Sequence, residues 1–446
     1  MACVSTPHGE LALPAFLPDA TRAVVRSLDS RDLEACGVPG LVVNAFHLAR
    51  RPGSRVTAAL GGVHRVMDWR RPVVTDSGGF QIYSLIRQNP RHGSITNKHV
   101  VFRVGGRGKA ERLSPEKSVQ IQLRLGADIL ICLDDCTHPD DPSAEQAASV
   151  DRTIAWARRC KHEFDRGLAA RGRQPRGRHT PGAASGEEGT VTVSRETVTD
   201  QRPPGSDGRG QQAEAPCAPG AASREERTVT VSRETVTDQM ASESPAEGAA
   251  AGIAAGRGAE AARPLLFAVV QGGGDAGLRR RCAEALVGIG FDGYCFGGWP
   301  FDSEGRFLAD TLALTAELLP DERPKYAMGI GNPASLIACV GMGYGLFDCA
   351  LPTRDARRGR LYAFRSARAD DLTFERVYIR DARQRREAGP VSAACDCLCC
   401  RTYTRAYLHH LFAIGDSLAW RLATLHNLRF YSMLTARLRR DAEANL

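Results

Sequence analysis

The sequence contains no long hydrophobic run, because nowhere do apolar residues continue for the roughly 20 positions that a membrane-spanning helix needs. The N-terminal residues, MACVSTPHGELALPAF, lack the basic and apolar segments of a secretory signal. A strong charge of one sign is also missing, since 59 Lys and Arg against 51 Asp and Glu leave a net charge of +8 over 446 residues. These absences argue against a helical membrane protein and predict a cytosolic one. The mild basic excess permits a polyanionic partner without requiring it.

Cysteines, in contrast, are plentiful at 14, although a cytosolic location argues against a disulfide framework. Four of them crowd into the segment CDCLCC, and three of these have the spacing C-x-C-x-x-C. Those three are Cys395, Cys397 and Cys400. Three thiolates and one imidazole would form a closed tetrahedral zinc site, which is structural because it keeps no open position. A helical pattern follows the cysteines, and the spacing does not choose among its candidate histidines, which are His409, His410 and His426.

Eight short apolar segments end on Gly, Asn, Asp or Gln, with helix-like segments between many of them. They are LPAFLP, GLVVNAFH, RPVVTDSGGF, ADILICLDDC, PLLFAVVQGG, FDGYCFGG, KYAMGIGN and GLFDCALP. The intervening segment SPEKSVQIQLRLG, for example, begins with Ser114 as a helix N-cap. Apolar strands that alternate with helices predict a parallel sheet covered on both faces. Eight such units favour an α/β fold of the (β/α)8 TIM-barrel type, with a doubly wound sheet as the alternative.

The composition changes between residues 166 and 263, where Gly, Ala, Arg, Glu, Ser and Thr dominate and aromatic residues are absent. The segment PGAASGEEGTVTVSRETVTDQ at 181–201 recurs at 219–239 with two substitutions. So little apolar surface cannot offset the entropy of ordering, which predicts a disordered insert. The barrel would then occupy residues 1–165 and 264–390, and a zinc-binding helical subdomain would occupy residues 391–446.

Carboxylates stand at three of the predicted strand ends, where barrel enzymes place their active sites. They are Asp76 in VVTDSGGFQ, Asp134 and Asp135 in LICLDDCTHP, and Asp348 in LFDCALP. Each alone could be a cap or turn residue. Together, two carboxylates could break a glycosidic bond while a third accepts hydrogen bonds from an N–H edge. Gln271 in VVQGGG and the pair Gly297 and Gly298 in CFGGWP would complete a site for a planar, purine-like base.

Basic residues follow the last of these strand ends at once. They are Arg354, Arg357, Arg358 and Arg360 in PTRDARRGR. Such a segment could be a solvated loop or a surface that attracts phosphate groups.

Taken together, these motifs resemble the queuine/preQ1 tRNA-guanine transglycosylase family of the bacterial type. TDSGGFQ, VVQGG, FGG, MGIGNP and FDCALPTR resemble its barrel motifs in the same order, and CDCLCC, LHHLF and HNLRFY resemble its zinc subdomain. The resemblance covers nearly the whole chain outside the insert. It implies a (β/α)8 barrel, a structural zinc ion and a homodimer that acts on tRNA.

The resemblance also implies roles for individual residues. Asp348 corresponds to the nucleophile and Asp76 to the general acid/base, and His426 becomes the fourth zinc ligand. The expected base-binding residues are Asp134, Cys136, Gln271, Gly297, Gly298 and Met328. The arginines expected near the RNA backbone are Arg354 and Arg357.

The implied reaction exchanges guanine at the anticodon wobble position for a 7-deazaguanine in queuosine modification, through a covalent ribosyl-aspartate intermediate. Cys136 favours preQ1 as the incoming base, with queuine as the alternative. A non-catalytic tRNA-binding subunit is a second interpretation, which the retention of Asp76 and Asp348 disfavours. Exchange on DNA is a third.

The sequence departs from the family's usual pattern at three places. Gly345 stands where an aspartate is usual, and Asp135 replaces a glutamate. Trp299 and Pro300 replace a Leu-Ala pair after the two glycines. A proline there cannot donate an N–H, which leaves the identity of the incoming base open.

Overall fold

The computed structural model describes residues 3–104, 109–138, 140–172, 263–368 and 370–444. Most of the predicted insert, including both copies of the repeated segment, lies outside these ranges. The predicted boundary between residues 165 and 166 falls inside a helix that continues to Gly172.

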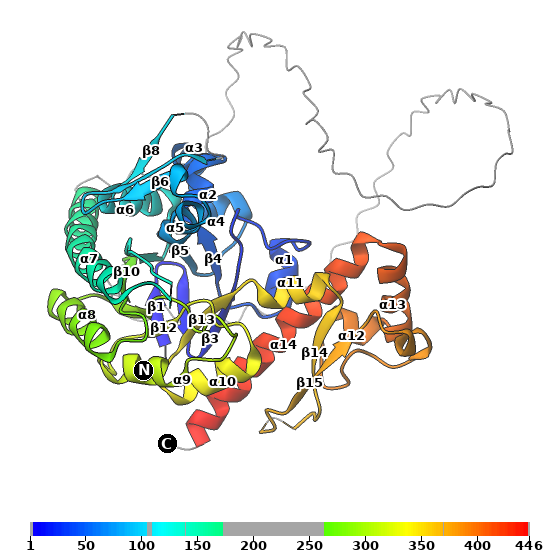
Figure 1. The fold of residues 1–446 in the computed structure, drawn as a ribbon. Helices are drawn as coiled ribbons and strands as arrows, with labels where there is room; N and C mark the ends of the chain where they lie inside the picture. The colour runs from blue at the N-terminus through cyan, green and yellow to red at the C-terminus, as the bar shows by residue number, and fades with distance from the viewer. Residues whose placement is uncertain (1–2, 105–108, 139, 173–262, 369, 445–446) are drawn as a thin grey trace, which may run out of the picture. The chain divides into compact units, whose positions relative to one another are not determined.

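Eight parallel strands form one central sheet (Figure 1). In the order in which they neighbour one another, they are β3 (Ala15–Pro18), β13 (Leu346–Cys349), β12 (Lys325–Ala327), β11 (Gly293–Phe296), β10 (Leu265–Val270), β9 (Ile129–Ile131), β5 (Val73–Asp76) and β4 (Leu41–Asn44). A parallel bridge between Asp19 and Val42 joins the two edges and closes the barrel. Each predicted apolar segment contains one of these strands, so the TIM-barrel prediction is confirmed and the doubly wound alternative is wrong.

Helices connect the strands and cover the outside of the barrel. They are α1 (Ser30–Ala35) after β3; α2 (Ala45–Arg50), α3 (Ser54–Ala59) and α4 (Gly62–Met67) after β4; α5 (Gly79–Gln88) and α6 (Pro115–Leu125) after β5; α7 (Ser143–Gly172) after β9; α8 (Ala276–Ile289) after β10; α9 (Ala309–Glu317) after β11; α10 (Pro333–Gly341) after β12; and α11 (Leu351–Arg357) after β13. As predicted, Ser114 caps α6, and its side chain accepts a hydrogen bond from the Lys117 N–H. None of the described helices combines the length and the apolar character needed to cross a membrane.

The lumen of the barrel is filled by inward-facing apolar side chains, which include Val74, Ile129 and Phe267. An N-terminal hairpin of β1 (Cys3–Thr6) and β2 (Gly9–Ala12) adds Val4 and Leu11 to the same cluster. The barrel is therefore a packed core, and any ligand must bind at a strand end.

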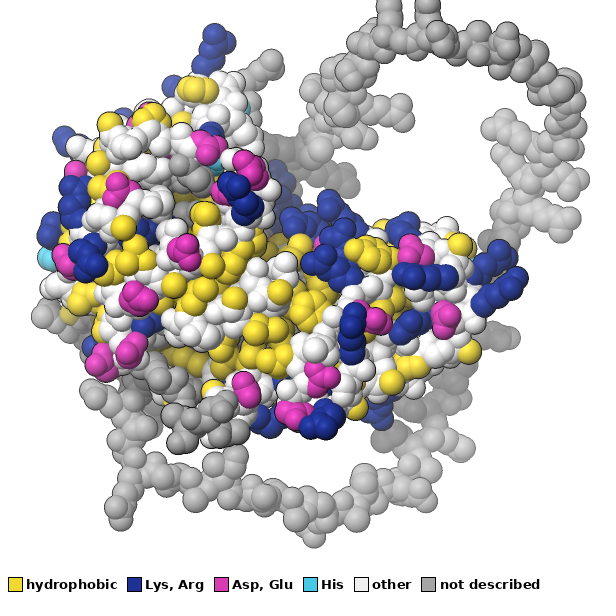
Figure 2. All heavy atoms as spheres, turned by 60° about the horizontal axis from the view of Figure 1, so that its bottom comes forward, with side chains coloured by type: hydrophobic (Ala, Val, Ile, Leu, Met, Phe, Trp, Pro, Cys, Tyr) yellow, Lys and Arg dark blue, Asp and Glu magenta, His cyan; other side chains and the backbone are white. Residues whose placement is uncertain are grey.

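A small antiparallel sheet of β6 (Gly93–Ile95), β7 (Val100–Phe102) and β8 (Glu111–Leu113) lies between α5 and α6 in the sequence, after the short 3-10 helix Pro90–His92. After α11, the chain forms an antiparallel pair of β14 (Arg360–Phe364) and β15 (Phe374–Tyr378), then the 3-10 helix Ala382–Arg386. Lys, Arg, Asp and Glu side chains are intermixed over the face of the molecule in Figure 2, in keeping with the small net charge.

The C-terminal segment contains α12 (Leu398–Thr402), α13 (Arg405–Ile414) and α14 (Ser417–Ala444). The sequence predicted one helical pattern here, but Gly415 adopts a left-handed conformation (φ 71°) and separates α13 from α14. The side chain of Asn427 on α14 donates hydrogen bonds to the carbonyl oxygens of Pro352 (2.9 Å) and Arg360 (3.1 Å) and accepts one from the Tyr362 N–H. One amide thus fastens α14 to both α11 and β14.

Candidate active site and metal centre

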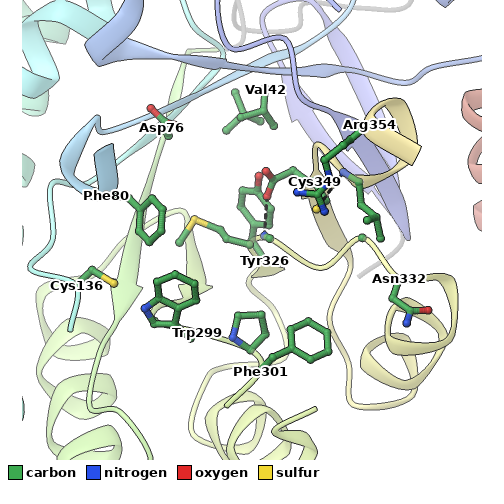
Figure 3. Close-up of a pocket in the computed structure, with 18 of the residues that line it drawn as sticks. Val42, Asp76, Phe80, Cys136, Trp299, Phe301, Tyr326, Asn332, Cys349 and Arg354 are labelled. Atoms are coloured by element: carbon green, nitrogen blue, oxygen red, sulfur yellow. Dashed lines mark hydrogen bonds between the residues drawn. The ribbon is translucent and has the colours of Figure 1, made fainter. Parts of the chain in front are cut away.

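A cavity of about 640 Å³ lies at the carboxyl ends of the barrel strands (Figure 3). It brings together residues that are far apart in the sequence but that follow different strands of one sheet. Among the predicted site residues, those that line the cavity are Asp76, Asp134, Cys136, Gly298, Met328, Asp348 and Arg354.

Asp348 occupies the end of β13 and accepts a hydrogen bond from the Gly329 N–H (3.1 Å). Burial raises the pKa of its carboxyl to about 6, although the Tyr326 hydroxyl and the Gly329 N–H both favour the ionised form. Tyr326 is itself buried on β12, next to the strand that carries Asp348. The sequence analysis missed Tyr326, although it belongs to KYAMGIGN, one of the predicted strand segments.

Asp76 ends β5 and accepts hydrogen bonds from the Asn44 side chain and from the N–H groups of Ala45 and Gly78. Burial raises its pKa to about 7, and the negative charge of Asp348 raises it further against the pull of these donors. The two carboxylates therefore share a cavity, and the charge of Asp348 affects the protonation of Asp76. Because Asn44 also ends a strand, in GLVVNAFH, the sequence carried a signal for this contact too.

Asp134 follows β9 and accepts a hydrogen bond from the Gln271 amide (Oδ2 to Nε2, 2.6 Å). Burial raises the pKa of Asp134 to about 6, while this hydrogen bond lowers it. Gln271 is only 1% exposed, and its Oε1 atom has no hydrogen-bond partner among the described residues. The pair therefore retains unused hydrogen-bonding capacity, as expected of a site that reads a polar ligand edge.

The two glycines after β11 lie in different places. Gly298 lines the cavity with a left-handed backbone (φ 95°). Gly297 does not line it; a side chain there would come within 2.6 Å of Gln271 Nε2. Gly297 therefore leaves room for Gln271, whereas Gly298 faces the cavity.

Arg279 on α8 is a positioning residue that the sequence analysis missed. Its guanidinium is buried and donates hydrogen bonds to the carbonyl oxygens of Val270, Gly273 and Gly297, at 2.9–3.0 Å. Burial lowers its pKa to about 10. It thus holds the loop after β10 against the loop after β11. In the sequence, GLRRRCAE offers no way to distinguish it from its two arginine neighbours.

Aromatic side chains form one wall of the cavity (Figure 3). Trp299 lies 5.6 Å from Phe80 and 5.4 Å from His138, measured between ring centroids. Trp299 was noted in the sequence as a departure, whereas Phe80 on α5 and His138 in the segment after β9 carried no local signal.

The two arginines expected near RNA occupy different environments on α11. Arg354 lines the cavity, but Arg357 does not. Burial lowers the pKa of Arg357, and the nearby charge of Arg26 lowers it further. A cationic region therefore borders the cavity on the side of Asp348.

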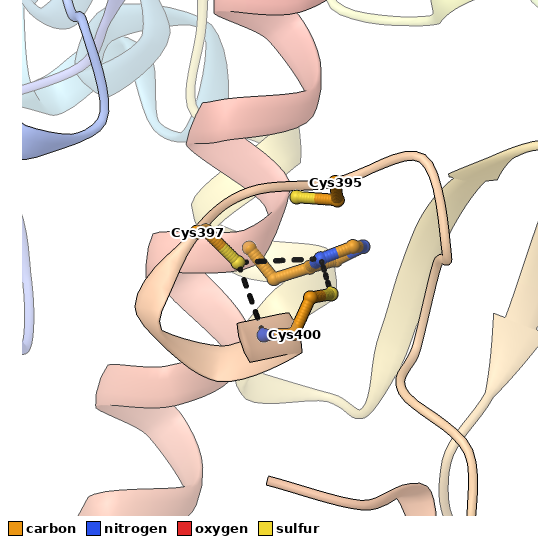
Figure 4. A group of neighbouring side chains, drawn as sticks. Cys395, Cys397 and Cys400 are labelled. Atoms are coloured by element: carbon orange, nitrogen blue, oxygen red, sulfur yellow. Dashed lines mark hydrogen bonds between the residues drawn. The ribbon is translucent and has the colours of Figure 1, made fainter. Parts of the chain in front are cut away.

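Three cysteines converge beside α14, which carries the histidine of the same cluster (Figure 4). The ligand atoms of Cys395, Cys397, Cys400 and His426 all lie within 4.8 Å of one another. His426 Nδ1 is 3.2 Å from the Cys400 Sγ, while its Nε2 lies 2.7 Å from the Tyr362 carbonyl oxygen. This second contact fixes the ring so that Nδ1 faces the thiols, which is the arrangement of a metal-binding imidazole. The donor set fits a closed zinc site.

The other two candidate histidines lie outside this cluster. His409 Nδ1 lies 2.8 Å from the Ile379 carbonyl oxygen, and His410 packs near the Tyr407 ring. Cys399 is buried and is not part of the cluster.

Comparison with known proteins identifies similar sequences along nearly the whole chain. A family model described as queuine tRNA-ribosyltransferase matches residues 1–179 and 217–445. A queuine tRNA-ribosyltransferase of Novosphingobium aromaticivorans is 32% identical, over 97% of this chain and 88% of the relative. Proteins of the same name from Solidesulfovibrio magneticus and Desulfosudis oleivorans are 33% and 34% identical, over 98% and 96% of this chain and 89% and 84% of the relatives.

Proposed function

Because this chain belongs to the queuine tRNA-ribosyltransferase family, as the sequence motifs predicted, we propose that it exchanges guanine at the anticodon wobble position of tRNA for a 7-deazaguanine. It is a tRNA-guanine transglycosylase, which is a pentosyltransferase. The observation that supports the detailed proposal is that Asp76 and Asp348 line one cavity, where the charge of Asp348 raises the pKa of Asp76. Asp134 lines the same cavity and could accept hydrogen bonds from a base.

In the proposed first step, the target guanine leaves the base stack and enters the cavity. A carboxylate oxygen of Asp348 attacks C1′ of the ribose. The C1′–N9 bond breaks, its electron pair goes to guanine, and Asp76 supplies the proton that neutralises the leaving base. The product is a ribosyl ester of Asp348.

In the second step, the incoming base gives its N9 proton to Asp76 and attacks C1′, and Asp348 leaves as a carboxylate. Two displacements retain the configuration of the sugar. A pKa of about 6 keeps Asp348 ionised at neutral pH, and a pKa of about 7 suits Asp76 to proton transfer in both directions.

For the incoming base, we favour preQ1, because the cavity wall contains Cys136, with queuine as the alternative. A zinc ion held by the three cysteines and His426 would be structural, since it crosslinks the loop of Cys395 to α14 and has no open position. We also expect a cytoplasmic homodimer, which light scattering of the purified protein would test.

The proposal is tested by incubating the purified full-length chain with unmodified tRNA and radiolabelled guanine. We expect incorporation that competes with preQ1, and an RNA–protein adduct on denaturing gels when an inert base analogue blocks the second step. Asp348→Asn should abolish both. Asp165→Asn, a change on the exposed surface of α7, is the matched control and should retain them.

An adduct that persists in Asp348→Asn would assign the nucleophile to another residue. If the wild-type protein binds tRNA without exchanging any base, the chain is instead a non-catalytic subunit. Incorporation into DNA but not into tRNA would favour the third interpretation.

A further inference from the structure

A second group of metal-ligand side chains lies at the amino end of the barrel. The described part of the chain contains two sets of three or more His, Cys, Asp or Glu whose ligand atoms lie within 4.8 Å of one another. The first is the thiol cluster, formed by the three cysteines and His426. The second consists of His8 in the turn between β1 and β2, His64 on α4 and Asp128 immediately before β9. Three distant segments of the sequence thus bring two imidazoles to one carboxylate.

The carboxylate of Asp128 is held in a fixed position. The backbone N–H of Asp128 donates to the Val73 carbonyl oxygen (2.9 Å), and its carbonyl oxygen accepts from the Leu265 N–H (2.7 Å). In the side chain, Oδ1 accepts from the His8 backbone N–H (3.1 Å) and Oδ2 accepts from the Val73 N–H (2.8 Å). Backbone donors therefore orient both carboxylate oxygens, as outer-shell partners orient a metal-binding carboxylate.

Each of these oxygens also meets one imidazole nitrogen. His8 Nδ1 lies 2.7 Å from Oδ1 of Asp128, and His64 Nε2 lies 3.0 Å from Oδ2. Only 10% of the His64 side chain is exposed, yet its Nε2 atom has no well-directed hydrogen bond with any described residue. A buried ring nitrogen that faces a carboxylate oxygen in this way is available as a metal ligand.

The two imidazole rings are stacked, with centroids 3.6 Å apart and planes inclined by 13°. Parallel rings direct their nitrogen lone pairs along parallel planes, so an ion bound by both requires one ring to tilt. The His8 side chain is 40% exposed and belongs to a hairpin turn, whereas His64 is buried on a helix. His8 is therefore the ring that has room to move onto an ion.

We propose that His8, His64 and Asp128 form a binding site for a divalent transition-metal ion, which locks the N-terminal hairpin onto the barrel. Two imidazoles favour ions such as Zn²⁺, Co²⁺ and Ni²⁺ over Mg²⁺ and Ca²⁺. The ion replaces the proton that His8 shares with the carboxylate, and three protein ligands leave a position for water.

The place of this site in the barrel makes its role structural. Asp128 precedes β9, whereas Asp348 ends β13, so the ion would lie at the opposite end of the parallel barrel from the cavity. The hairpin that carries His8 also contributes Val4 and Leu11 to the core of the lumen. An ion that holds the hairpin therefore protects that core. The inference does not depend on the proposed function.

The experiment titrates the full-length, zinc-loaded protein with Co²⁺ and measures bound cobalt and zinc after equilibrium dialysis. We expect one cobalt ion per chain in addition to the zinc, with weak visible absorption and without the intense near-ultraviolet band of a cobalt–thiolate bond. His8→Ala should weaken cobalt binding by about 100-fold or more, because it removes a ligand. His162→Ala removes an exposed histidine of α7 that belongs to neither cluster, so this matched control should keep the wild-type affinity.

A second variant separates metal binding from the hydrogen bond that His8 makes without an ion. His8→Gln keeps a side-chain N–H that can donate to Asp128 but lacks the imidazole. Without metal, this variant should unfold at about the wild-type temperature. Added Co²⁺ should raise the midpoint of thermal unfolding of the wild-type protein and of His162→Ala, but not that of His8→Gln.

Three outcomes would overturn the inference. If the wild-type protein binds no cobalt beyond its zinc, the cluster is held by hydrogen bonds alone. An equal cobalt affinity in folded His8→Ala would place the ion elsewhere. A cobalt–thiolate band with an equal loss of zinc would show that cobalt has only entered the thiol cluster. Because none of these measurements uses guanine exchange, a failure of the proposed function would not alter their results.

Discussion

The two ends of the barrel both bury aspartates, but in opposite electrostatic states. At the carboxyl end, burial raises the pKa values of Asp76, Asp134 and Asp348 to between about 6 and 7. At the amino end, Asp128 immediately precedes β9 and is fully buried, yet its pKa is held below the usual range. Burial opposes this lowering, and the hydrogen bonds from His64 and His8 outweigh it.

The difference lies in the partners rather than in the burial. Asp128 accepts from His8 Nδ1 (2.7 Å) and the Val73 N–H (2.8 Å), and His64 Nε2 lies 3.0 Å away. His8 belongs to the turn of the N-terminal hairpin, so Asp128 ties that hairpin to α4 and the sheet. The aspartates in the cavity instead accept hydrogen bonds from backbone N–H groups, amide side chains and the Tyr326 hydroxyl, and their pKa values stay raised. A buried carboxylate acts as a clamp when its hydrogen bonds hold its pKa low, and as a reagent when burial raises its pKa toward neutrality.

The largest test of this contrast removes a carboxylate from the catalytic end. Asp76→Asn should lower kcat for guanine exchange by about 10²- to 10⁴-fold, because an amide cannot shuttle the proton. Single-turnover assays at pH 8 would measure the loss. Thermal unfolding should show no loss of stability, since a buried charge has been removed. Near wild-type turnover would exclude the acid/base role.

The corresponding change at the other end should affect folding instead. Asp128→Asn leaves two histidines and the backbone N–H groups of His8 and Val73 short of a charged acceptor, so the free energy of unfolding should drop by about 3 kcal/mol. Urea denaturation followed by circular dichroism would measure this. Folded Asp128→Asn should keep its kcat. A stability equal to that of the wild-type protein would show that the clamp contributes nothing.

The pH dependence of stability should have opposite signs at the two ends. The pKa of Asp134 is raised in the folded protein. Its contribution to stability is therefore full below its pKa in the unfolded chain, near 4, and is lost as the pH rises through about 6. The free energy of unfolding of Asp134→Asn, relative to that of the wild-type protein, should therefore rise by about 1 kcal/mol between pH 5 and pH 8. Asp128, with a lowered pKa, contributes above the unfolded value and loses that contribution in acid. Parallel trends in the two variants would contradict the comparison.

The catalytic end should also give a bell-shaped rate profile. Exchange requires ionised Asp348 and protonated Asp76, so kcat/KM should fall about tenfold per pH unit below about 6 and again above about 7. Because the two groups interact, the apparent values belong to the pair. A profile that is flat from pH 5 to pH 9 would refute the assignment of these roles.

The smallest expected effect concerns the surfaces of the two ends. Arg354→Ala, beside the cavity, should weaken tRNA binding and reduce the slope of log affinity against log salt by about one. Arg323→Ala, an exposed arginine just before β12 at the amino end, is the matched control and should leave the slope unchanged. Filter binding at several salt concentrations would measure both. Equal effects would mean that the contact is not specific to the catalytic end.

The eight strands were predictable because each is a buried run that ends on a residue with a turn or site role. Asp76, Asp134 and Asp348 could be proposed for the same reason, since parallel strand ends meet at one edge. The sequence could not show which glycine supports Gln271, that Arg279 is buried, or that Phe80 and His138 approach Trp299. Those facts depend on contacts between segments that are distant in the chain. The break at Gly415 was missed because the apolar spacing continues across it.

The side-chain amide of Asn427 connects α14, which carries a residue of the metal cluster, to the segment that follows Asp348. The neighbouring residue, His426, belongs to the thiol cluster. The side chain of Asn427 donates a hydrogen bond to the Pro352 carbonyl oxygen at the start of α11, four residues after Asp348. Oxidation of the thiols would shift α14, and that displacement would pass through Asn427 to Pro352 and the segment that carries the nucleophile. Oxidative damage at the thiol cluster would thus appear first as lost turnover, before the barrel itself unfolds.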